Sequence, residues 1–351
     1  MPAAGAGYLR PWDDVSDIVD FEDPRWLTDN ILPAANGKHY VLAFERPGEV
    51  GNVIWYNKDV LKAAGITEDP GQLALDGNWT WEKFREMLKA CTRDTDNDGV
   101  KDVFGLGSIT GYTDIAFSLA VSNDSGILKS DGQEFKKAYE EPAFMEAISF
   151  FDQLVNTDKV LRLYDNMNSQ EKWNDMPSTD TVLGEFRNGT FGFLAARMWV
   201  GNQQLKPLMQ EKQYGMVVFP KGPQAEDYIQ DAQTLGGFVL TTTNKDYEKS
   251  ATIFNAIARP VEGFEDPQVM NETIASDFFQ DGDETSFKNY ELAMKKVRID
   301  YGYGVQLVYQ QLNHAVVESV FWHIDTPAVA IDGMKGLGDA QIKNTYKKLF
   351  E

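Results

Sequence analysis

The chain has one cysteine and three histidines among its 351 residues. One cysteine excludes an internal disulfide, and the histidines show no HExxH spacing, so a zinc site of that type is not expected. Basic residues are also scarce, because 33 lysines and arginines stand against 54 acidic residues, for a net charge of −21. This acidic excess excludes a protein whose main partner is nucleic acid, since phosphates require a basic face.

Long apolar runs are missing as well. The sequence has no stretch of the roughly 18 apolar residues that a transmembrane helix needs, and its first residues lack the basic start and apolar centre of a signal peptide. What is present is a hydrophobic content of 42% with 12% aromatic residues, enough to build real cores. A chain of 351 residues with this composition predicts two α/β lobes.

Residues 51–107 hold the most informative pattern. Residues 53–56 (VIWY) form a short apolar run between Gly51 and Asn57, which is typical of a strand covered on both faces. A helix is predicted directly afterwards at residues 59–64, and Thr80 is expected to cap a second helix. The apolar side chains of that second helix fall on one face, at Trp81, Phe84, Leu88 and Cys91.

Further helices are indicated by apolar residues at helical spacing. One begins at Pro142, one runs over about 246–258 and stops before Pro260, and a long one ends near Trp322. A last helix is predicted around residues 342–349. Strand and helix patterns thus alternate along the chain, as in an α/β protein.

The order strand, helix, helix, acidic loop and strand in residues 51–107 resembles the family 1 extracellular solute-binding proteins, the maltose-binding-protein-like family. Residues 185–201, 214–223 and 235–240 resemble further segments of that family. The resemblance implies a periplasmic-binding-protein-like (type II) fold, in which each of two lobes is a sheet flanked by helices. It also implies that the protein is no enzyme but a monomer outside the cytoplasm that captures a carbohydrate, of oligosaccharide size, for an ABC permease.

The resemblance also implies lobe boundaries. Lobe 1 is expected at residues 1–46 and 241–300, and lobe 2 at residues 47–240 and 301–351, with crossings near 45–50, 235–241 and 300–305. Family members normally open with a strand, a helix and a second strand that are absent here, so lobe 1 is expected to be truncated. A lipid anchor, as in a cell-surface lipoprotein, would lie outside this sequence.

Ligand contacts are implied by the same resemblance. A neutral sugar needs aromatic plates for its C–H faces and planar polar groups for its hydroxyls. The candidates are Glu45, Arg46 and Glu49 in the first crossing, Tyr112 and Asp114 after the strand begun at Phe104, Arg197 and Trp199, Gly236 and Gly237 in the second crossing, and Trp322. For Trp199 and Trp322 a place in the core stays an alternative, and Trp173 is either a further plate or a surface residue.

An acidic loop at residues 94–102 follows a calcium-loop pattern. The predicted ligands are Asp94, Asp96, Asp98, Val100 and Asp102, with Gly99 at the sixth position. The usual glutamate at the twelfth position is replaced by Gly105, so a structural Ca²⁺ would need a remote ligand. The alternative is a turn held by its own Asx hydrogen bonds without metal.

Two other functions stay open at this point. Because 54 acidic residues make paired carboxylates plentiful, a glycoside hydrolase that uses two acids of the cleft is the main alternative. The missing start of lobe 1 also allows a fragment that binds nothing. Neither a GxSxG elbow nor a complete dinucleotide fingerprint occurs, and no organic cofactor is expected.

Overall fold

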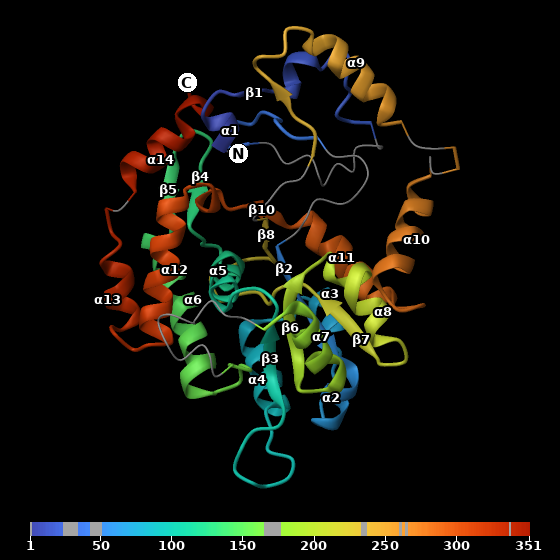
Figure 1. Cartoon of the computed structure of the whole chain (residues 1–351), viewed down its shortest axis with the longest axis vertical. Coiled ribbons are helices and arrows are strands. Elements are labelled where there is room, and N and C mark those ends of the chain that lie inside the picture. The colour runs from blue at the N-terminus through green and yellow to red at the C-terminus, as the bar shows by residue number, and fades with distance from the viewer. Residues whose placement is uncertain are drawn as a thin grey trace.

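The structure is a computed structural model that describes residues 2–23, 34–42, 51–164, 177–232, 237–259, 262–263, 266–336 and 338–351. The fold is mixed α/β and consists of a larger and a smaller group of helices and strands (Figure 1). In this view the smaller group, with β1 and α9, lies at the top, and β8 and β10 lie between the groups. Within the described residues, no helix is both long enough and apolar enough to cross a bilayer.

The larger group is built around a four-stranded sheet with the order β3-β6-β2-β7. These strands span Phe104–Ser108 (β3), Phe191–Arg197 (β6), Asn52–Asn57 (β2) and Tyr214–Val217 (β7). Strand β2 runs antiparallel to both of its neighbours, whereas β3 is parallel to β6. All six residues of β2 are buried, which confirms the strand predicted at residues 53–56. Its apolar run therefore lies at the centre of the fold.

Helices pack against this sheet. Helices α4 (Trp81–Cys91) and α7 (Thr179–Asn188) contact β3 and β6, and α2 (Lys58–Ala63), α3 (Pro70–Leu75) and α11 (Glu284–Lys295) contact β7. Helix α5 (Tyr112–Ser122) packs between β2 and α6 (Pro142–Asp152). The other helices of this group are α1 (Pro2–Gly5), α8 (Lys206–Met209), α10 (Pro267–Phe278), α12 (Gln306–Val320), α13 (Pro327–Asp332) and α14 (Asp339–Tyr346).

The helix patterns read from the sequence are confirmed. Thr80 caps α4 as predicted, because its hydroxyl accepts a hydrogen bond from the Lys83 N–H at 3.4 Å. The four apolar residues predicted for one face of this helix are all buried. Helix α6 begins at Pro142, and α9 (Tyr247–Ile257) and α12 lie where the apolar spacing placed them. The first predicted helix begins one residue early, at Lys58, because the side chain of Asn57 caps it.

The smaller group has a hydrophobic core of its own. Strands β1 (Leu9–Arg10) and β9 (Leu240–Thr241) pair antiparallel, and α9 packs beside them. We call this core the small core; it consists of Trp12, Val15, Val19, Leu42, Leu240, Ala251, Phe254 and Ala258. The described residues form one further hydrophobic cluster, which we call the large core. It contains the apolar residues of the four-stranded sheet and of the helices packed on it.

Two short sheets complete the described structure. Strands β8 (Gln230–Ala232) and β10 (Val297–Ile299) pair in parallel between the groups, and β4 (Leu128–Ser130) and β5 (Phe135–Lys137) form a hairpin. Helix α11, which the predicted boundaries placed in lobe 1, packs on β7, and its Tyr290 and Met294 lie in the large core. The lobe boundaries themselves stay a prediction.

Candidate functional site

Polar side chains gather at one edge of the four-stranded sheet, where β2 begins and β3 and β6 end. Asn52 opens β2 and lies opposite Arg197, the last residue of β6. Ser108 ends β3 on the same edge, opposite Ala195. The edge faces β8, because the N–H of Gly51 donates a hydrogen bond to the Asp231 carbonyl. This polar edge therefore lies next to the short sheet between the two groups of elements.

Asn52 is fixed in place by hydrogen bonds. It is 2% exposed, its Nδ2 donates to Ser118 Oγ at 3.2 Å, and its Oδ1 accepts from Thr110 Oγ1 at 3.4 Å. The Ser108 hydroxyl in turn donates to the Thr110 carbonyl at 2.8 Å. A buried amide with both ends bonded is held rigidly. The turn between β3 and α5 is thereby tied to the start of β2.

That turn brings Asp114, in the first turn of α5, into the group. The carboxylate of Asp114 accepts a hydrogen bond from the Tyr309 hydroxyl at 3.3 Å. Burial raises the pKa of Asp114, while the positive charge of Arg197 and the bond from Tyr309 act against that rise. The charge of Arg197 therefore acts on Asp114, although the two residues are 83 positions apart in the sequence (197 minus 114).

Two tyrosines lie beside this pair. The rings of Tyr303 and Tyr309 have centroids 5.2 Å apart, and the Tyr303 hydroxyl donates to Asp231 Oδ2 at 3.1 Å. Burial, followed by the negative charges of Asp231 and Asp114, raises the pKa of Tyr303 well above its ordinary value. Burial and Asp114 likewise raise the pKa of Tyr309. Both phenols are therefore neutral donors at physiological pH.

We call this set the Asp114 cluster. It consists of Asn52, Thr110, Asp114, Arg197, Asp231, Tyr303 and Tyr309. It combines a carboxylate, a guanidinium, an amide, hydroxyls and two aromatic rings. Asn52 and Asp231 are buried, whereas Asp114, Arg197 and the two tyrosines are partly exposed. The exposed members can fork hydrogen bonds onto neighbouring hydroxyl groups and cover an apolar C–H face. These are the requirements for holding a polyhydroxylated solute.

Comparison with known proteins decides the family. The family described as "Bacterial extracellular solute-binding protein" matches residues 2–252. The chain belongs to this family. The relationship expected from residues 51–107 is thereby confirmed. No curated protein matches the chain.

Solved structures with the same fold are distant in sequence. An ABC substrate-binding protein from Listeria monocytogenes in complex with cycloalternan is 17% identical, with a TM-score of 0.62 over 99% of this chain and 82% of that one. The maltose/maltodextrin-binding domain MalE from Bdellovibrio bacteriovorus, bound to maltotriose, is 17% identical, with a TM-score of 0.60 over 99% and 81%. UgpB from Mycobacterium tuberculosis in complex with glycerophosphocholine is 15% identical, with a TM-score of 0.60 over 99% and 79%. The predicted two-lobe solute-binding fold is confirmed.

Of the ligand contacts predicted for this solute-binding protein, Asp114 and Arg197 belong to the Asp114 cluster, where the charge of Arg197 acts on the pKa of Asp114. Trp199 follows two residues after Arg197 and is partly buried against the large core. Tyr112 is 2% exposed, and its hydroxyl donates to the Arg162 carbonyl, so its side chain lies within the large core. A ligand contact for each of these residues stays a prediction.

Trp322 lies at the far end of α12. Tyr309 belongs to the first turn of that helix, which ends at Val320, two residues before Trp322. The Trp322 ring makes an edge contact with His314, with ring centroids 6.1 Å apart. A ligand contact of Trp322 stays a prediction.

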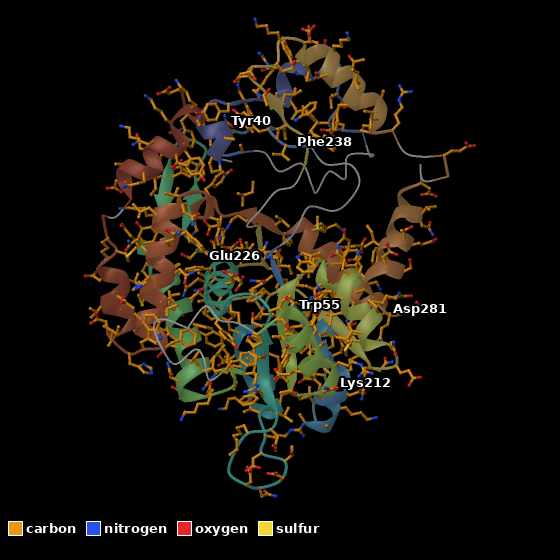
Figure 2. All side chains as sticks on the ribbon, viewed as in Figure 1. Tyr40, Trp55, Lys212, Glu226, Phe238 and Asp281 are labelled. Carbon is orange, nitrogen blue, oxygen red and sulfur yellow. The ribbon has the colours of Figure 1, made fainter. Side chains whose placement is uncertain are left out.

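The crossing residues are described only in part. Glu45, Arg46, Glu49, Gly236 and Trp173 lie outside the described residues. Gly237 lies at the small core, where its neighbour Phe238 forms a bridge with Leu42 (Figure 2 labels Phe238). A Cβ on Gly237 would lie 2.6 Å from the Leu42 carbonyl oxygen, so only glycine allows this close approach of the two backbones.

Five members of the Asp114 cluster were not predicted. Asn52, Thr110, Asp231 and Tyr303 carry no motif, and Tyr309 was part of an apolar helix stripe in the sequence. One signal was available: Asn52 is a polar residue that directly precedes the four apolar residues of strand β2. A buried amide there must find partners, which marks a polar site at the strand end.

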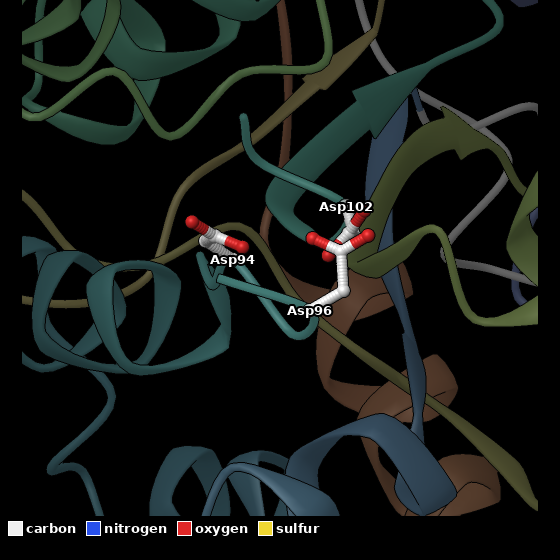
Figure 3. A group of neighbouring side chains, drawn as sticks. All are labelled: Asp94, Asp96 and Asp102. Carbon is white, nitrogen blue, oxygen red and sulfur yellow. The ribbon is translucent and has the colours of Figure 1, made fainter. Parts of the chain in front are cut away.

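The acidic loop folds back on itself (Figure 3). Carboxylate oxygens of Asp94, Asp96 and Asp102 lie within 4.8 Å of one another. Asp94 accepts hydrogen bonds from the N–H groups of Asn97 and Gly99, at 2.7 and 2.8 Å. Hydrogen bonds from Thr95 lower the pKa of Asp102. The Asp98 carboxylate accepts a hydrogen bond from the Val100 N–H at 2.7 Å, outside the group of three. Three hard oxygen donors fit Ca²⁺, although they do not complete the six to eight ligands that it prefers.

Proposed function

We propose that this protein captures a carbohydrate of oligosaccharide size between its two groups of elements and delivers it to an ABC permease. The Asp114 cluster carries the proposal, because it places a coupled carboxylate and guanidinium beside two tyrosines at the sheet edge between the groups. The family supports solute binding outside the cytoplasm. Two structures of the same fold hold cycloalternan and maltotriose, which supports a sugar as the ligand.

The chemistry of the cluster favours a neutral solute over an ion. The carboxylate of Asp114 and the guanidinium of Arg197 have opposite charges, which interact before any ligand arrives. A carboxylate that accepts and a guanidinium that donates can hold adjacent hydroxyls of one sugar ring. Trp199, two residues beyond Arg197, would supply an aromatic plate from the same strand end. Closure of the two lobes around the sugar would then present the loaded form to the permease.

Calorimetric titration tests this ligand class. The probes are maltohexaose, cycloalternan and chitohexaose, with glycerophosphocholine as a non-sugar that a protein of this fold holds. We expect one sugar to bind and Asp114→Asn to weaken it by about tenfold to a hundredfold, since a hydrogen bond to a charged group contributes about 1.5–3 kcal/mol. Asp180→Asn is the matched control, because Asp180 is an exposed aspartate in the first turn of α7.

Three results would overturn the assignment. Tight binding of glycerophosphocholine with no sugar binding would move the ligand class away from carbohydrates. Equal affinity in the wild type and Asp114→Asn would remove the cluster from the ligand site. Release of reducing ends from a bound oligosaccharide during long incubation would favour the hydrolase alternative, whereas a binding protein returns the sugar intact.

For the acidic loop we propose a weak, structural Ca²⁺ site at Asp94, Asp96 and Asp102. Calcium binding to the folded state would raise the melting temperature, and Asp96→Asn would abolish that rise. Asp94 is not the residue to change, because its carboxylate also holds the turn through two backbone N–H groups. A melting temperature that is the same with calcium and with chelator would show that the loop is an Asx-bonded turn.

We further propose that the protein acts as a monomer outside the cytoplasm, held at the membrane by a lipid anchor or by its permease. The family description supports the location. Light scattering after size-exclusion chromatography should give a mass near 39.5 kDa. A mass of twice that value at micromolar concentration would contradict the monomer.

A further inference from the structure

A second groove lies on the larger group, apart from the Asp114 cluster. It has a volume of about 750 Å³ and lies between the first turn of α4, α6 and the loop at residues 221–225. Its lining shares no residue with the cluster. The two sites are separated by α5, since Asp114 is in its first turn, whereas Ser122 at its other end bonds to Trp81 in the groove. This separation is about 12 Å along the helix axis.

The floor of the groove is a stacked aromatic pair. The rings of Trp81 and Phe150 lie 4.6 Å apart and are nearly parallel, with an interplanar angle of 9°. Trp81 is 4% exposed, and its Nε1 donates to Ser122 Oγ at 3.1 Å, so the indole is fixed. Phe150 is only partly buried and covers it. A flat ring on a rigid support therefore borders the groove, as the C–H face of a sugar requires.

The rim carries planar polar groups of both charges. Glu82 and Glu146 contribute carboxylates, and Arg85 and Lys221 contribute cations. The Glu146 carboxylate accepts from Asn123 Nδ2 at 3.0 Å and from Gln224 Nε2 at 3.1 Å. The Arg85 guanidinium is paired with Asp158 at 2.5 and 2.9 Å, so the rim charges without such a pairing are those of Glu82, Glu146 and Lys221. Carboxylates that accept hydrogen bonds and an ammonium group that donates them suit a hydroxylated ligand, and the small acidic excess disfavours an anion.

Both walls of the groove are held in place. The N–H of Lys221 donates to the Trp79 carbonyl at 3.0 Å, and the N–H of Trp81 donates to the Lys221 carbonyl at 3.1 Å. The N–H of Gly222 donates to the Ser122 carbonyl at 2.9 Å. A Cβ on Gly222 would lie 2.4 Å from Asn123 Oδ1, so only glycine lets the loop approach this closely. Walls fixed in this way lose little entropy when a ligand binds.

We propose that this groove is a second carbohydrate site, which holds a short segment of a neutral polysaccharide. The site is independent of the ligand bound at the Asp114 cluster. Its ring platform and its carboxylate, ammonium and amide groups, the last from Gln153, are the partners that such a segment needs. The protein would thereby stay close to the polymer from which its smaller ligand is released.

Native gel electrophoresis through soluble polysaccharides tests this site. The gels contain soluble starch, hydroxyethylcellulose or neutral arabinoxylan, and retardation relative to a gel without polymer reports binding. We expect the wild type to be retarded by at least one polymer, and Phe150→Ala to bind about tenfold more weakly or not at all. Phe350→Ala is the matched control, because Phe350 is an aromatic residue that is 36% exposed at another surface.

Further variants separate the two sites. Asp114→Asn should be retarded like the wild type, so its failure in titration and its success in the gel would identify two independent sites. If Phe150→Ala lowers the melting temperature, a double variant of the rim, Gln153→Ala with Lys221→Ala, replaces it. This double variant should also not be retarded by the polymer. The proposal is overturned if no polymer retards the wild type. It is also overturned if both groove variants are still retarded, or if Asp114→Asn abolishes the retardation.

Discussion

The two hydrophobic cores of the described residues differ in size. The large core holds the four-stranded sheet, and the tryptophans Trp55, Trp79 and Trp81 within it are almost entirely buried. Among the residues that the structure describes, the small core consists of eight buried residues around one two-stranded sheet and one helix. Because the fraction of surface buried rises with the size of a core, the small core must contribute much less stability.

The smaller group also exposes many apolar side chains. Eleven large apolar residues of the described chain are exposed, and five of them surround the small core: Tyr8, Phe238, Val239, Ile253 and Ile257. Among these, Ile257 is 64% exposed and Tyr8 is 68% exposed. A group with few buried contacts and much exposed apolar surface opens locally at low free energy. We therefore expect the smaller group to open while the larger one stays folded.

The largest effect is expected from Phe193→Ala in the large core. Phe193 is fully buried in β6, and its ring contacts those of Phe84, Trp79 and Tyr56. Removing it should lower the free energy of global unfolding by about 3–5 kcal/mol, because a cavity remains. Urea unfolding followed by tryptophan fluorescence measures this loss, and a loss under about 1 kcal/mol would show that the sheet is not the main source of stability.

Trp12→Ala should produce a local effect only. The Trp12 indole donates to the Phe238 carbonyl at 3.1 Å and packs on Phe254, with ring centroids 4.8 Å apart. Without it, amide hydrogen exchange in β1, β9 and α9 should rise by about a hundredfold or more. Exchange in β2 and β6 should change by less than about threefold. Equal acceleration in both groups, measured by mass spectrometry, would show that the two cores unfold as one unit.

We expect Asp300 to make the stability of the larger group depend on pH. This carboxylate is 3% exposed and accepts hydrogen bonds from the N–H groups of Ile127, Leu128 and Gly302. Burial raises the pKa of Asp300 in the folded state. Since the folded state then holds the proton more tightly than the unfolded state, the stabilisation is complete below the unfolded pKa near 3.9 and is lost as the pH rises.

Asp300→Asn cannot titrate and should not show this loss. Above pH 4, the unfolding free energy of the wild type should fall relative to that of Asp300→Asn. The fall should be up to about 1.4 kcal/mol per pH unit. Urea unfolding at several pH values between 3.5 and 7 measures that difference. A difference that does not vary with pH would mean that the folded state leaves the pKa of Asp300 unshifted.

The smallest effect on stability is expected from the double variant Ile253→Lys with Ile257→Lys on α9. Both side chains are more than half exposed, so the unfolding free energy should change by no more than about 0.5 kcal/mol. Solubility should rise, because a patch of apolar surface is removed. A loss of more than 2 kcal/mol would show that these side chains are covered in solution, by a second copy of the chain or by another partner.

Much of the larger group was predictable from local patterns. Strand β2, the capped helix α4, the start of α6 at Pro142 and the apolar face of α12 follow from periodicity and capping, which act over one or two turns of chain. Helix boundaries were less certain, as the start of α2 shows, because the Asn57 side chain can end a strand and cap a helix at once.

The candidate site was predictable only in part. Asp114 and Arg197 were found through the family resemblance, whereas Asn52, Asp231 and Tyr303 come from three distant segments that no short motif joins. Tyr309 has the spacing of an apolar core residue, yet its hydroxyl is turned to Asp114. The spacing of a side chain indicates the face of a helix, but it does not indicate which polar partner lies opposite.

The sequence by itself determined the class of the protein: an acidic α/β chain of the extracellular solute-binding family, with its strand, helix and acidic loop in order. These properties depend on composition and on neighbours a few residues apart. Tertiary structure alone decided that the charge of Arg197 acts on Asp114, that Trp81 stacks on Phe150 and that the small core stands apart from the large one. Each of these depends on contacts between residues tens to hundreds of positions apart, and such contacts exist only after the sheet has brought the segments together.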